Sequence, residues 1–386
     1  MINAMLLDNN LQPIRIVDVY QSLIWTDRFD ECGDFELHIP VECFNIHDMQ
    51  KGYYLYNSES EHTMILETIG IDADTEKATC FVVSGRSLET IPSRRIVWNQ
   101  TVFKATLGSD NKTYVKPNLQ KCLKQLYDEN LINPAIAARK IDNFIFEEST
   151  DPRITELTLE VQYYGEDLYS ITTTLCKEHN IGFKITLDES NNFRFRLHAG
   201  VDRSFDQFIN PYVVFSPSYD NLRSSSYLDS DQTLKNVTLV SGEEDSTVTD
   251  PNKDDEITPR VTHVVELIGD NTGLNRREIF TDASSLSSET DDGETLTWEQ
   301  YQANLRHKGI DTLMENATIK AFEGEAVPDR PFVYGEDYFI GDIVQLINEY
   351  GHEGTACISE FVWSYSESGV SAYPTFKTIQ KGIYEE

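Results

Sequence analysis

The amino-acid sequence predicts a β-rich α+β fold, in which two small antiparallel β domains are interrupted by two α+β insertion domains. Three observations lead to this prediction: short segments of alternating apolar and polar residues at the start, amphipathic helical segments in the middle, and a second set of alternating segments at the end. The predicted parts are a first β domain at 1–103, an α+β domain at 104–205, a second, discontinuous β domain at 206–242 plus 326–380, and an inserted α+β domain at 243–325.

Residues 22–40, SLIWTDRFDECGDFELHIP, give the clearest strand signal. The run FELHI alternates apolar with polar residues, which is the pattern of a strand with one buried and one solvated face. Gly33 and Asp34 come directly before it, where a turn is expected, and Pro40 ends it because proline has no amide hydrogen to donate to a sheet. The stretch is therefore predicted to form an antiparallel hairpin.

Other strands are predicted after this hairpin, at residues 53–56, 63–71 and 78–83. Residues 1–20 are predicted to form a hairpin of their own, with Ile14, Ile16 and Val19 facing inward. About six strands within ~85 residues indicate a closed or nearly closed β domain, because open sheet edges favour aggregation. The segment 84–98, SGRSLETIPSRRIVW, is predicted to close this domain through a short helical turn.

Three later segments place apolar residues at helical spacing. They are 118–130, NLQKCLKQLYDEN; 166–179, EDLYSITTTLCKEH; and 297–317, TWEQYQANLRHKGIDTLMENA. Thr297 is the expected N-cap of the last helix, and Gly309 is expected to kink or break it. Strands are predicted beside the first two helices, at 140–146, 155–161, 183–187 and 193–197.

The chain ends in a predicted three-stranded meander, at residues 343–347, 355–365 and 370–376. A meander of this size cannot bury itself alone, so it is expected to pair with strands in residues 210–242. The acidic stretch EEDSTVTDPNKDDE, which begins at residue 243, is predicted to be an exposed loop, because it lacks the order of acids found in calcium-binding loops.

The chain carries 65 acidic and 32 basic residues, a formal net charge of −33. This excess argues against an ordinary DNA-binding protein, which needs a basic surface to replace the counterions of phosphates. The isolated pairs at 94–95 and 276–277, all arginines, are interpreted as partners in structural ion pairs. Most acids are expected to form a solvated surface, and the alternative is that some line a channel through which a polyanion slides. No run approaches the ~20 apolar residues of a membrane span, and no secretory signal is visible.

Six cysteines are scattered along the sequence without a C-x-x-C pairing, and they are predicted to be buried free thiols. The sequence lacks a Walker loop, a dinucleotide-binding fingerprint, G-x-S-x-G and H-E-x-x-H. Cys176 and His179 share a predicted helix, but a core cysteine beside an exposed histidine is favoured over a metal site. No catalytic, cofactor-binding or metal-binding residue is therefore predicted, no cofactor is expected, and the chain is predicted not to be an enzyme.

Three stretches, taken together and in this order, resemble the phage Gp37-like family of siphophage tail-tip and baseplate hub proteins. They are SLIWTDRFDECGDFELHIP, SGRSLETIPSRRIVW, and YFIGDIVQLINEYG followed by ISEFVWSYSESGVSAYPTFK. Each stretch alone is an ordinary β-rich segment, but their order and spacing are more specific, and the resemblance extends over nearly the whole chain. The family is also similar to the contractile-phage baseplate hub and to the N-terminal part of tail-associated lysins.

The resemblance implies that each β domain is a small β-barrel and that the chain forms a homotrimer with pseudo-sixfold symmetry, which joins the hexameric tail tube to the tip. The implied partners are other copies of the chain, a hexameric distal tail or tail-tube protein, the tape-measure protein, and other baseplate or receptor-binding proteins. Viral DNA would pass through the lumen without specific binding during ejection and host entry. The chain is expected to be made in the bacterial cytoplasm and to act in the virion, where it closes or gates the DNA channel.

Two alternatives are open at this stage. One is a tail-associated cell-wall hydrolase, although longer family members carry a C-terminal lysozyme- or peptidase-like extension and this sequence ends at Glu386, which favours a structural hub. The other is a carbohydrate-binding adhesion module, suggested by tyrosines in β-rich segments, namely Tyr53, Tyr54, Tyr56, Tyr163 and Tyr164.

Overall fold

The structure is a computed structural model of the chain. It describes residues 4–43, 45–72, 79–97, 113–114, 118–157, 162–163, 165–252, 256–289, 295–316, 319–326, 331–366 and 369–378. The described residues divide into two compact units. Unit 1 contains those up to Ser226 and those from Phe322 onward, and unit 2 contains those of Tyr227–Ala321.

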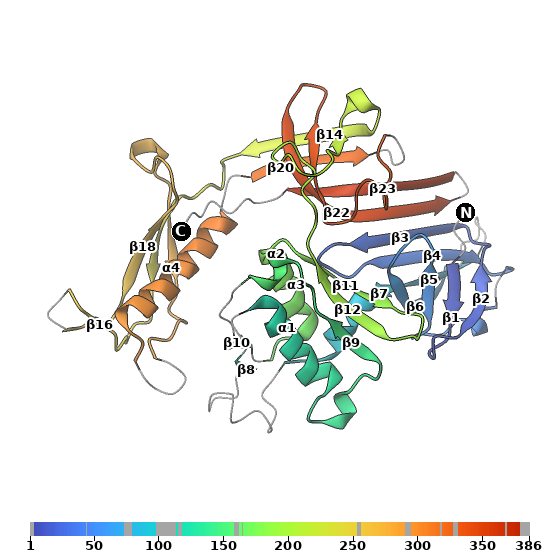
Figure 1. Ribbon diagram of the computed structural model, residues 1–386, viewed down its shortest axis with the longest axis horizontal. Helices are drawn as coiled ribbons and strands as arrows, with labels where there is room; N and C mark the ends of the chain where they lie inside the picture. Colours follow the sequence, from blue (N-terminus) through green and yellow to red (C-terminus); the bar gives the residue numbers. More distant parts are fainter. Residues whose placement is uncertain are drawn as a thin grey trace. The chain divides into compact units, whose positions relative to one another are not determined.

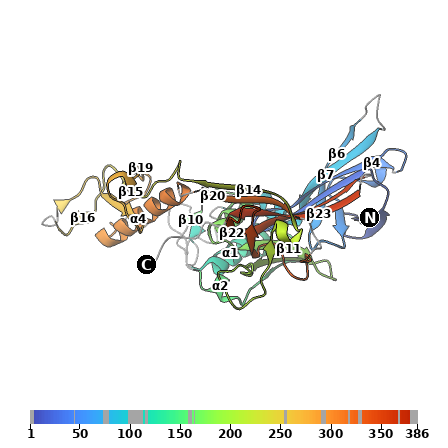
Figure 2. The same cartoon turned by 90° about the horizontal axis from the view of Figure 1, so that it is seen from above.

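Unit 1 is built around one mixed sheet of eleven strands (Figure 1). The strands are β1 (Ala4–Leu7), β2 (Pro13–Val17), β3 (Ser22–Arg28), β4 (Asp34–Pro40), β5 (Tyr54–Asn57), β6 (Thr63–Asp72), β7 (Cys80–Ser87), β13 (Val214–Phe215), β21 (Ile343–Ile347), β22 (Glu353–Ser366) and β23 (Gly369–Thr378). They follow the order β13-β21-β22-β3-β4-β7-β6-β5-β1-β2, and β23 also pairs with β22. Figure 2 shows the long strands β6 and β7 side by side.

The first and the last parts of the chain meet in the middle of this sheet. β3 pairs antiparallel with β4 on one side and with β22 on the other, and the buried Trp25 of β3 lies opposite the buried Trp363 of β22. Strands predicted for two separate β domains therefore belong to one continuous sheet, and no closed barrel occurs among the described residues. The β-rich α+β class is confirmed, whereas the two barrels and the boundaries of the four domains stay predictions.

The hairpin at the start of the chain is confirmed, but its predicted inward face is wrong. β1 pairs antiparallel with β2, and Val17 lies opposite Ala4. Val17 is buried, whereas the residues predicted to face inward are exposed; these are Ile14, Ile16 and Val19. Side chains alternate between the two faces of a strand, and the prediction chose the face of β2 that points away from Ala4, while Val19 lies beyond the end of the strand.

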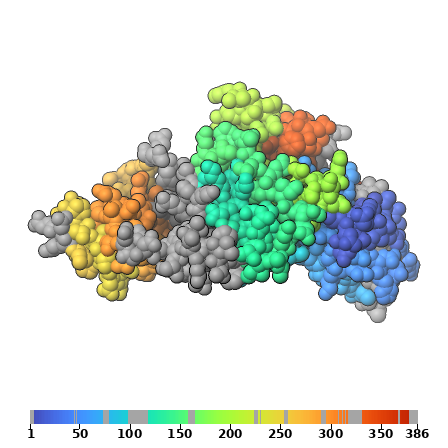
Figure 3. Space-filling model, turned by 60° about the horizontal axis from the view of Figure 1, so that its bottom comes forward, coloured from blue at the N-terminus to red at the C-terminus, as the bar shows by residue number. Residues whose placement is uncertain are grey.

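A second layer of unit 1, with its own apolar core, is formed by the segment between β7 and β13 (green in Figure 3). Its elements are the 3-10 helix η2 (Leu88–Arg94), β8 (Thr113–Tyr114), α1 (Leu119–Tyr127), β9 (Phe144–Glu147), α2 (Pro152–Thr155), β10 (Gln162–Tyr163), α3 (Leu168–Glu178), β11 (Gly182–Leu187) and β12 (Phe193–His198). The helices predicted at 118–130 and 166–179 are confirmed as α1 and α3. The strand predicted at 155–161 is not observed, because Thr155 ends α2 and residues 158–161 lie outside the described residues.

Unit 2 is a small sheet with a long helix packed against it. Its elements are β15 (Val237–Ser241), β16 (Thr249–Asp250), β17 (Glu256–Ile257), β18 (Thr262–Glu266), β19 (Glu278–Asp282) and α4 (Trp298–Glu315). β15 is the central strand, antiparallel to β18 and parallel to β19. Val240, Val265 and Tyr301 belong to the core that joins the sheet to α4. A separate two-stranded sheet pairs β14 (Leu222–Ser230) with β20 (Ile319–Ala326).

Gly309 does not break α4, contrary to the prediction. The helix continues through this position, and Gly309 is buried against β15 and β18. A Cβ atom here would lie 2.7 Å from the Cγ2 atoms of both Val240 and Val265. The glycine therefore serves close packing of helix on sheet rather than a change of helix direction.

The predicted N-cap of α4 is confirmed. The Oγ1 atom of Thr297 accepts a hydrogen bond from the backbone N–H of Gln300 at 3.3 Å. The Gln300 side chain accepts one from the backbone N–H of Thr297 at 3.1 Å, which completes a capping box.

The C-terminal meander is confirmed as β21, β22 and β23. Of the strands in residues 210–242 that were expected to pair with it, only some do. β13 pairs with β21, as predicted. β15 also lies within residues 210–242, yet it pairs with β18 and β19, because Val240 contributes to the core under α4. The acidic stretch from residue 243 is likewise not a simple exposed loop, since Ser246 and Val248 are buried and part of it forms β16.

The cysteines are free thiols, and five of the six are buried as predicted, whereas Cys43 is exposed. Burial raises the pKa of the Cys122 thiol to about 12. In the part of the chain that the structure describes, no helix combines the length and the apolar character that crossing a bilayer requires.

Candidate functional site: the hairpin junction

The tip of the hairpin formed by β3 and β4 contacts segments of unit 1 that are distant in the sequence. Phe29 follows β3 directly and is 1% exposed. Its ring lies against Gly182 of β11 and against Gly341, which precedes β21. A Cβ atom at these glycines would lie 2.4 and 2.2 Å from atoms of the ring, so only glycine fits at either position. The ring of His198 completes the contact in a T-shaped arrangement, with ring centroids 5.2 Å apart at an angle of 81°.

The backbone of Phe29 is held as firmly as its ring. Its N–H donates to the carbonyl of Ser359 in β22 at 3.0 Å, and its carbonyl accepts from the N–H of Phe183 in β11 at 3.2 Å. Phe29 thus connects the β3–β4 hairpin to the helical layer and to the C-terminal strands. We use the name hairpin junction for Phe29, its two glycines and the polar cluster of Asp27, Ser60, His62 and Glu89.

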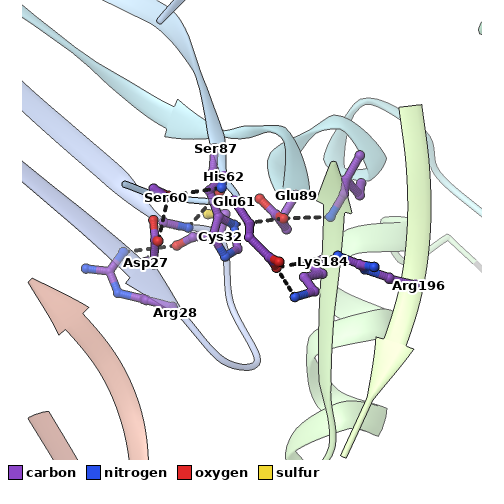
Figure 4. Close-up of polar contacts among 12 residues, drawn as sticks. Asp27, Arg28, Cys32, Ser60, Glu61, His62, Ser87, Glu89, Lys184 and Arg196 are labelled. Atoms are coloured by element: carbon purple, nitrogen blue, oxygen red, sulfur yellow. Dashed lines mark hydrogen bonds and ion pairs between the residues drawn. The ribbon is translucent and has the colours of Figure 1, made fainter. Parts of the chain in front are cut away.

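The polar cluster comes from three parts of the chain (Figure 4). Asp27 lies in β3, Ser60 and His62 lie in the connection between β5 and β6, and Glu89 lies in η2. Asp27 accepts hydrogen bonds from Trp25 Nε1 at 2.9 Å and from Ser60 Oγ at 2.6 Å. Ser60 Oγ in turn accepts a hydrogen bond from the backbone N–H of His62 at 3.0 Å.

His62 and Glu89 form the charged centre of the cluster. The His62 Nδ1 atom lies 3.0 Å from Glu89 Oε1. The same carboxylate oxygen accepts a hydrogen bond from the backbone N–H of Ile185 in β11 at 2.6 Å. The cluster therefore fixes β11 to β3, η2 and the β5–β6 connection, and the packing of Phe29 fixes β11 to the β3–β4 hairpin as well.

The charges of the cluster shift one another's pKa values. Burial lowers the pKa of His62, but the attraction of Glu89 and Asp27 outweighs burial and raises this pKa to about 9. Burial raises the pKa of Glu89, but His62 and the hydrogen bonds to the carboxylate lower it below its ordinary value. At Asp27 burial dominates, so its pKa is raised. At neutral pH His62 is therefore an imidazolium held by the Glu89 carboxylate.

Among the described residues, five further ion pairs link the hairpin tip and the neighbouring β5–β6 connection to other elements. The pairs are Arg28–Glu360, Asp30–Lys377, Glu31–Lys177, Glu61–Lys184 and Glu61–Arg196. Their partners lie on β22, β23, α3, β11 and β12. The exposed pair Glu31–Lys177 contributes at most about 1 kcal/mol. Asp30 is 6% exposed, so its pair with Lys377 holds the junction together with the buried cluster and the packing of Phe29.

The cluster is closed to solvent. Asp27, His62 and Glu89 are 1%, 6% and 0% exposed. A substrate cannot reach them in this conformation, and the arrangement is suited to holding chain segments together rather than to proton transfer with a bound molecule.

The sequence analysis predicts no site residue, and it does not identify this cluster. Asp27 and Ser60 are 33 positions apart, and none of the four residues belongs to a known motif. The one local signal is Glu89 itself, the only charged residue of the turn SLETIP.

Among the described residues, the others that the sequence analysis singled out do not belong to the hairpin junction. Cys176 is fully buried and His179 is partly buried. Among the described residues, no group of three or more His, Cys, Asp or Glu is arranged to hold a metal ion. Tyr56 is 44% exposed, while the side chains of Tyr163 and Tyr164 lie outside the described residues.

The arginine pairs behave differently from each other. Arg276 forms the predicted ion pairs, with Glu266 at 2.8 Å and with Glu278 at 2.5 Å. Arg95 instead donates to the backbone carbonyl of Arg139 at 2.9 Å. The prediction of ion pairing is therefore confirmed for Arg276, and it stays a prediction for Arg95.

The family of the chain follows from a comparison with protein-family models. The model of the Siphovirus ReqiPepy6 Gp37-like protein family matches residues 3–376, a range that includes the whole hairpin junction. The chain belongs to this family. The resemblance inferred from the three sequence stretches is thus confirmed. No curated protein matches the chain.

Three solved structures have a similar fold over nearly their whole length. They are the 43 kDa tail protein of prophage MuSo2 from Shewanella oneidensis (TM-score 0.55, 11% identity, covering 97% of this chain and 98% of that one), the tail protein from Neisseria meningitidis MC58 (0.54, 11%, 99% and 97%) and the prophage tail protein gp18 from Listeria monocytogenes EGD-e (0.52, 13%, 99% and 96%). At these identities the likeness concerns the fold.

Proposed function

We propose that this Gp37-like chain is a structural protein of a phage tail, and that it acts there as the hub of the baseplate or tail tip. As a homotrimer it joins the hexameric tail tube to the tip and closes or gates the DNA channel. The observation that carries the proposal is the family match over residues 3–376, together with the fold shared with three tail proteins. Its proposed partners are the distal tail or tail-tube protein, the tape-measure protein and other baseplate or receptor-binding proteins.

The hairpin junction supports a structural role for unit 1. A symmetric hub has to present the same surfaces from every copy, which requires that distant segments keep a fixed arrangement. Phe29 and the cluster around His62 provide this fixation without exposing reactive groups to solvent. This proposal treats the chain as non-enzymatic.

The acidic composition supports a passage for DNA. With a net charge of −33, acids that face the lumen of the hub would repel phosphates, and DNA would slide without binding. A reconstruction of the assembled ring with a neutral or basic lumen would contradict this part of the proposal.

The direct test is to locate the chain in phage particles. Particles of the phage or prophage that encodes it are purified, analysed by mass spectrometry and labelled with gold-conjugated antibodies against the chain. We expect the chain in the particles and the label at the end of the tail. Its absence from particles that are otherwise intact would overturn the proposal.

The trimer is tested separately, by light scattering and negative-stain images of the purified chain. The expected mass is three times the chain mass of 44.2 kDa, with a central opening in the images. Clearing of purified cell wall in a zymogram would favour the hydrolase instead, and saturable binding to a glycan would favour the adhesion module.

A further inference from the structure

Two edges of the three-stranded sheet of unit 2 lack a neighbouring strand among the described residues. β15 is the central strand, and no further strand pairs with the outer side of β18 or of β19. An edge strand presents unpaired N–H and C=O groups, and many proteins protect such edges with proline, lysine or a β-bulge. The two strands, THVVE and EIFTD, contain neither proline nor lysine, and their ladders with β15 have no bulge. Both edges are therefore open to another strand.

The hydrogen-bond pattern identifies the residues of β18 whose backbone points outward. The N–H of Gly242 donates to the carbonyl of Val261 at 2.9 Å, so Val261 bonds toward the central strand. Because hydrogen-bonded residues recur at every second position of an antiparallel ladder, His263 and Val265 also bond to β15. The residues between them direct their N–H and C=O groups away from β15. We name these residues the β18 edge: Thr262, Val264 and Glu266.

The same reasoning applies to β19. The N–H of Val237 donates to the carbonyl of Arg277 at 3.3 Å, and the N–H of Ala283 donates to the carbonyl of Ser241 at 2.8 Å. The odd-numbered residues of β19 therefore bond to β15, and the even-numbered ones direct their backbone groups outward. We name these the β19 edge: Glu278, Phe280 and Asp282. In the part of the chain that the structure describes, no group forms a hydrogen bond with the outward backbone of either edge.

The two edges also carry exposed apolar side chains. Val265 of β18 and Ile279 of β19 pack toward α4. Their neighbours Val264 and Phe280 therefore point to the opposite face of the sheet, where they are 51% and 60% exposed. Leu239 of β15 is in register with both and is 43% exposed, so the three side chains form a row across the sheet. Backbone groups and apolar side chains that lack a partner thus occur together at each edge.

The two edges complement each other, which indicates a second copy of the chain as the partner. β18 runs antiparallel to β15 and β19 runs parallel to it, so β19 of one copy meets β18 of the next copy antiparallel, with both helices on the same face. When Phe280 lies opposite Val264 of the next copy, Asp282 faces Thr262, whose hydroxyl group can donate to the carboxylate. Each pair of facing residues then exchanges two backbone hydrogen bonds.

The third pair in this register brings two acids together, and an arginine lies beside each. Glu278 faces Glu266 of the next copy. Within one copy Arg276 bridges these two acids, at 2.8 Å from Glu266 and 2.5 Å from Glu278. Across the joined edges each facing carboxylate therefore keeps the guanidinium of its own chain, which reduces the repulsion between the two acids.

We propose that β18 of one copy pairs with β19 of the next copy, and that three copies joined in this way close a ring in which neither edge is free. A head-to-tail contact of two different surfaces generates a ring when its rotation closes, and closure removes both open edges. This inference rests on the proposed function, because the number of copies is that of the proposed homotrimer.

The test is disulfide cross-linking in tail particles assembled with the full chain. The variant combines Val264→Cys and Phe280→Cys with Cys43→Ser, because the other native cysteines are buried. Within one copy β15 separates the two positions by two strand spacings, roughly 9.5 Å, which is too far for a disulfide. After mild oxidation, a non-reducing gel should show dimers and trimers of the chain and no larger species. Either cysteine replacement alone should give monomers only.

The matched control combines Val264→Cys with Leu274→Cys in the same Cys43→Ser background. Leu274 is 100% exposed but belongs to neither edge, so this variant should stay monomeric. Dimers from Val264→Cys alone would indicate that two β18 strands pair, and species larger than a trimer would indicate an open array. Either result would overturn the proposal. Monomers alone from the double cysteine variant would also overturn it, while its presence in the particles would leave the proposed function intact.

A second measurement uses Val264→Pro in the purified chain. Proline removes the outward N–H at this position and leaves the hydrogen bonds to β15 in place, so the thermal unfolding temperature should be that of the wild type. The concentration at which half of the trimer dissociates, measured by light scattering, should rise at least about tenfold. Val264→Thr keeps the N–H group and should remain close to the wild type. An unchanged trimer in Val264→Pro would contradict the proposal. A wild-type chain absent from otherwise intact particles would instead mean that the proposed function has failed.

Discussion

In both units an aromatic ring packs against glycine, but the sequence distance between the contacting residues differs. In unit 1 the ring of Phe29 lies between Gly182 and Gly341, residues from distant parts of the chain. In unit 2 the fully buried Tyr301 packs at Gly242, where a Cβ atom would lie 2.5 Å from its hydroxyl oxygen. That hydroxyl accepts from the backbone N–H of Glu243 at 2.9 Å and donates to the carbonyl of Leu286 at 3.1 Å.

The difference concerns both sequence distance and charge. The buried residues of the described core of unit 2 all lie between Val240 and Leu313, and its central ring makes neutral hydrogen bonds. Unit 1 joins segments from the beginning, the middle and the end of the chain, and it buries an ion pair to do so. Contacts between distant segments cost more loop-closure entropy, so unit 1 needs stronger individual interactions.

The largest expected effect is at Phe29. Replacing it by Ala empties the space between two glycines that cannot fill it, so Phe29→Ala should cost unit 1 about 3–5 kcal/mol. Hydrogen exchange followed by mass spectrometry should show faster exchange in β3, β11 and β22, with β15 and β18 unchanged. Phe280→Ala is the control, since Phe280 is 60% exposed. Equal losses for the two variants would mean that the junction is not central to unit 1.

The next effect is the removal of the buried ion pair. His62→Gln leaves the Glu89 carboxylate buried without its charge partner, which should cost about 3 kcal/mol in chemical unfolding. His38→Gln serves as control, because His38 forms its contact with Glu36, at 2.8 Å, on the surface.

The loss at His62 should depend on pH. The pKa of His62 is about 9 in the folded protein, above its ordinary value of 6.5, so its stabilisation is complete below pH 6.5 and is lost as pH rises through 9. The stability difference between wild type and His62→Gln should therefore narrow between these two pH values. A constant difference over this range would contradict a charged His62.

A smaller effect is expected from Gly309→Ala in unit 2. The added methyl group would press on Val240 and Val265, which costs about 1–3 kcal/mol, whereas the better helix propensity of Ala returns about 1 kcal/mol. A net loss of about 1 kcal/mol should appear in the exchange of β15 and α4. Asn304→Ala on the exposed side of α4 should have no such cost. A stabilised Gly309→Ala variant would contradict the prediction, because it would mean that the helix and the sheet move apart without cost to accept the methyl group.

The smallest effect is expected at the N-cap of α4. Thr297→Ala removes one half of the capping box and should cost about 1 kcal/mol or less. Thr312→Ala within the same helix should be neutral or slightly stabilising, since Ala has the higher helix propensity. Exchange rates in the first turn of α4 measure the difference, and identical rates for the two variants would argue against the cap.

Local patterns predict the elements of this chain well. The alternation in FELHI identifies β4, helical spacing identifies α1, α3 and α4, and Thr297 identifies where α4 begins. The details that were predicted wrongly also depend on local patterns, where two interpretations fit the sequence equally well. In β2 both faces carry apolar residues, so alternation alone cannot say which one is buried.

Pairings between distant segments are not visible in such patterns. β15 is an apolar strand that would suit either sheet, and only the packing of α4 assigns it to unit 2. A glycine inside a helical pattern indicates a helix break, but Gly309 lies where the helix packs closely on the sheet. The polar cluster of the hairpin junction combines Asp27, His62 and Glu89 through tertiary contacts alone, which no single-sequence motif encodes.

The pairing of β3 with β22 has a consequence for the timing of synthesis. Arg28 and Glu360, which form an ion pair across these strands, are 332 positions apart. At roughly 5–20 residues per second, a ribosome needs about 20–70 s to make the distance between them, and during this time β3 lacks one neighbour. The core under α4 is synthesised earlier, because the buried residues that form it all lie between Val240 and Leu313. A nascent or truncated chain therefore cannot close the central sheet until nearly all of its residues have been translated.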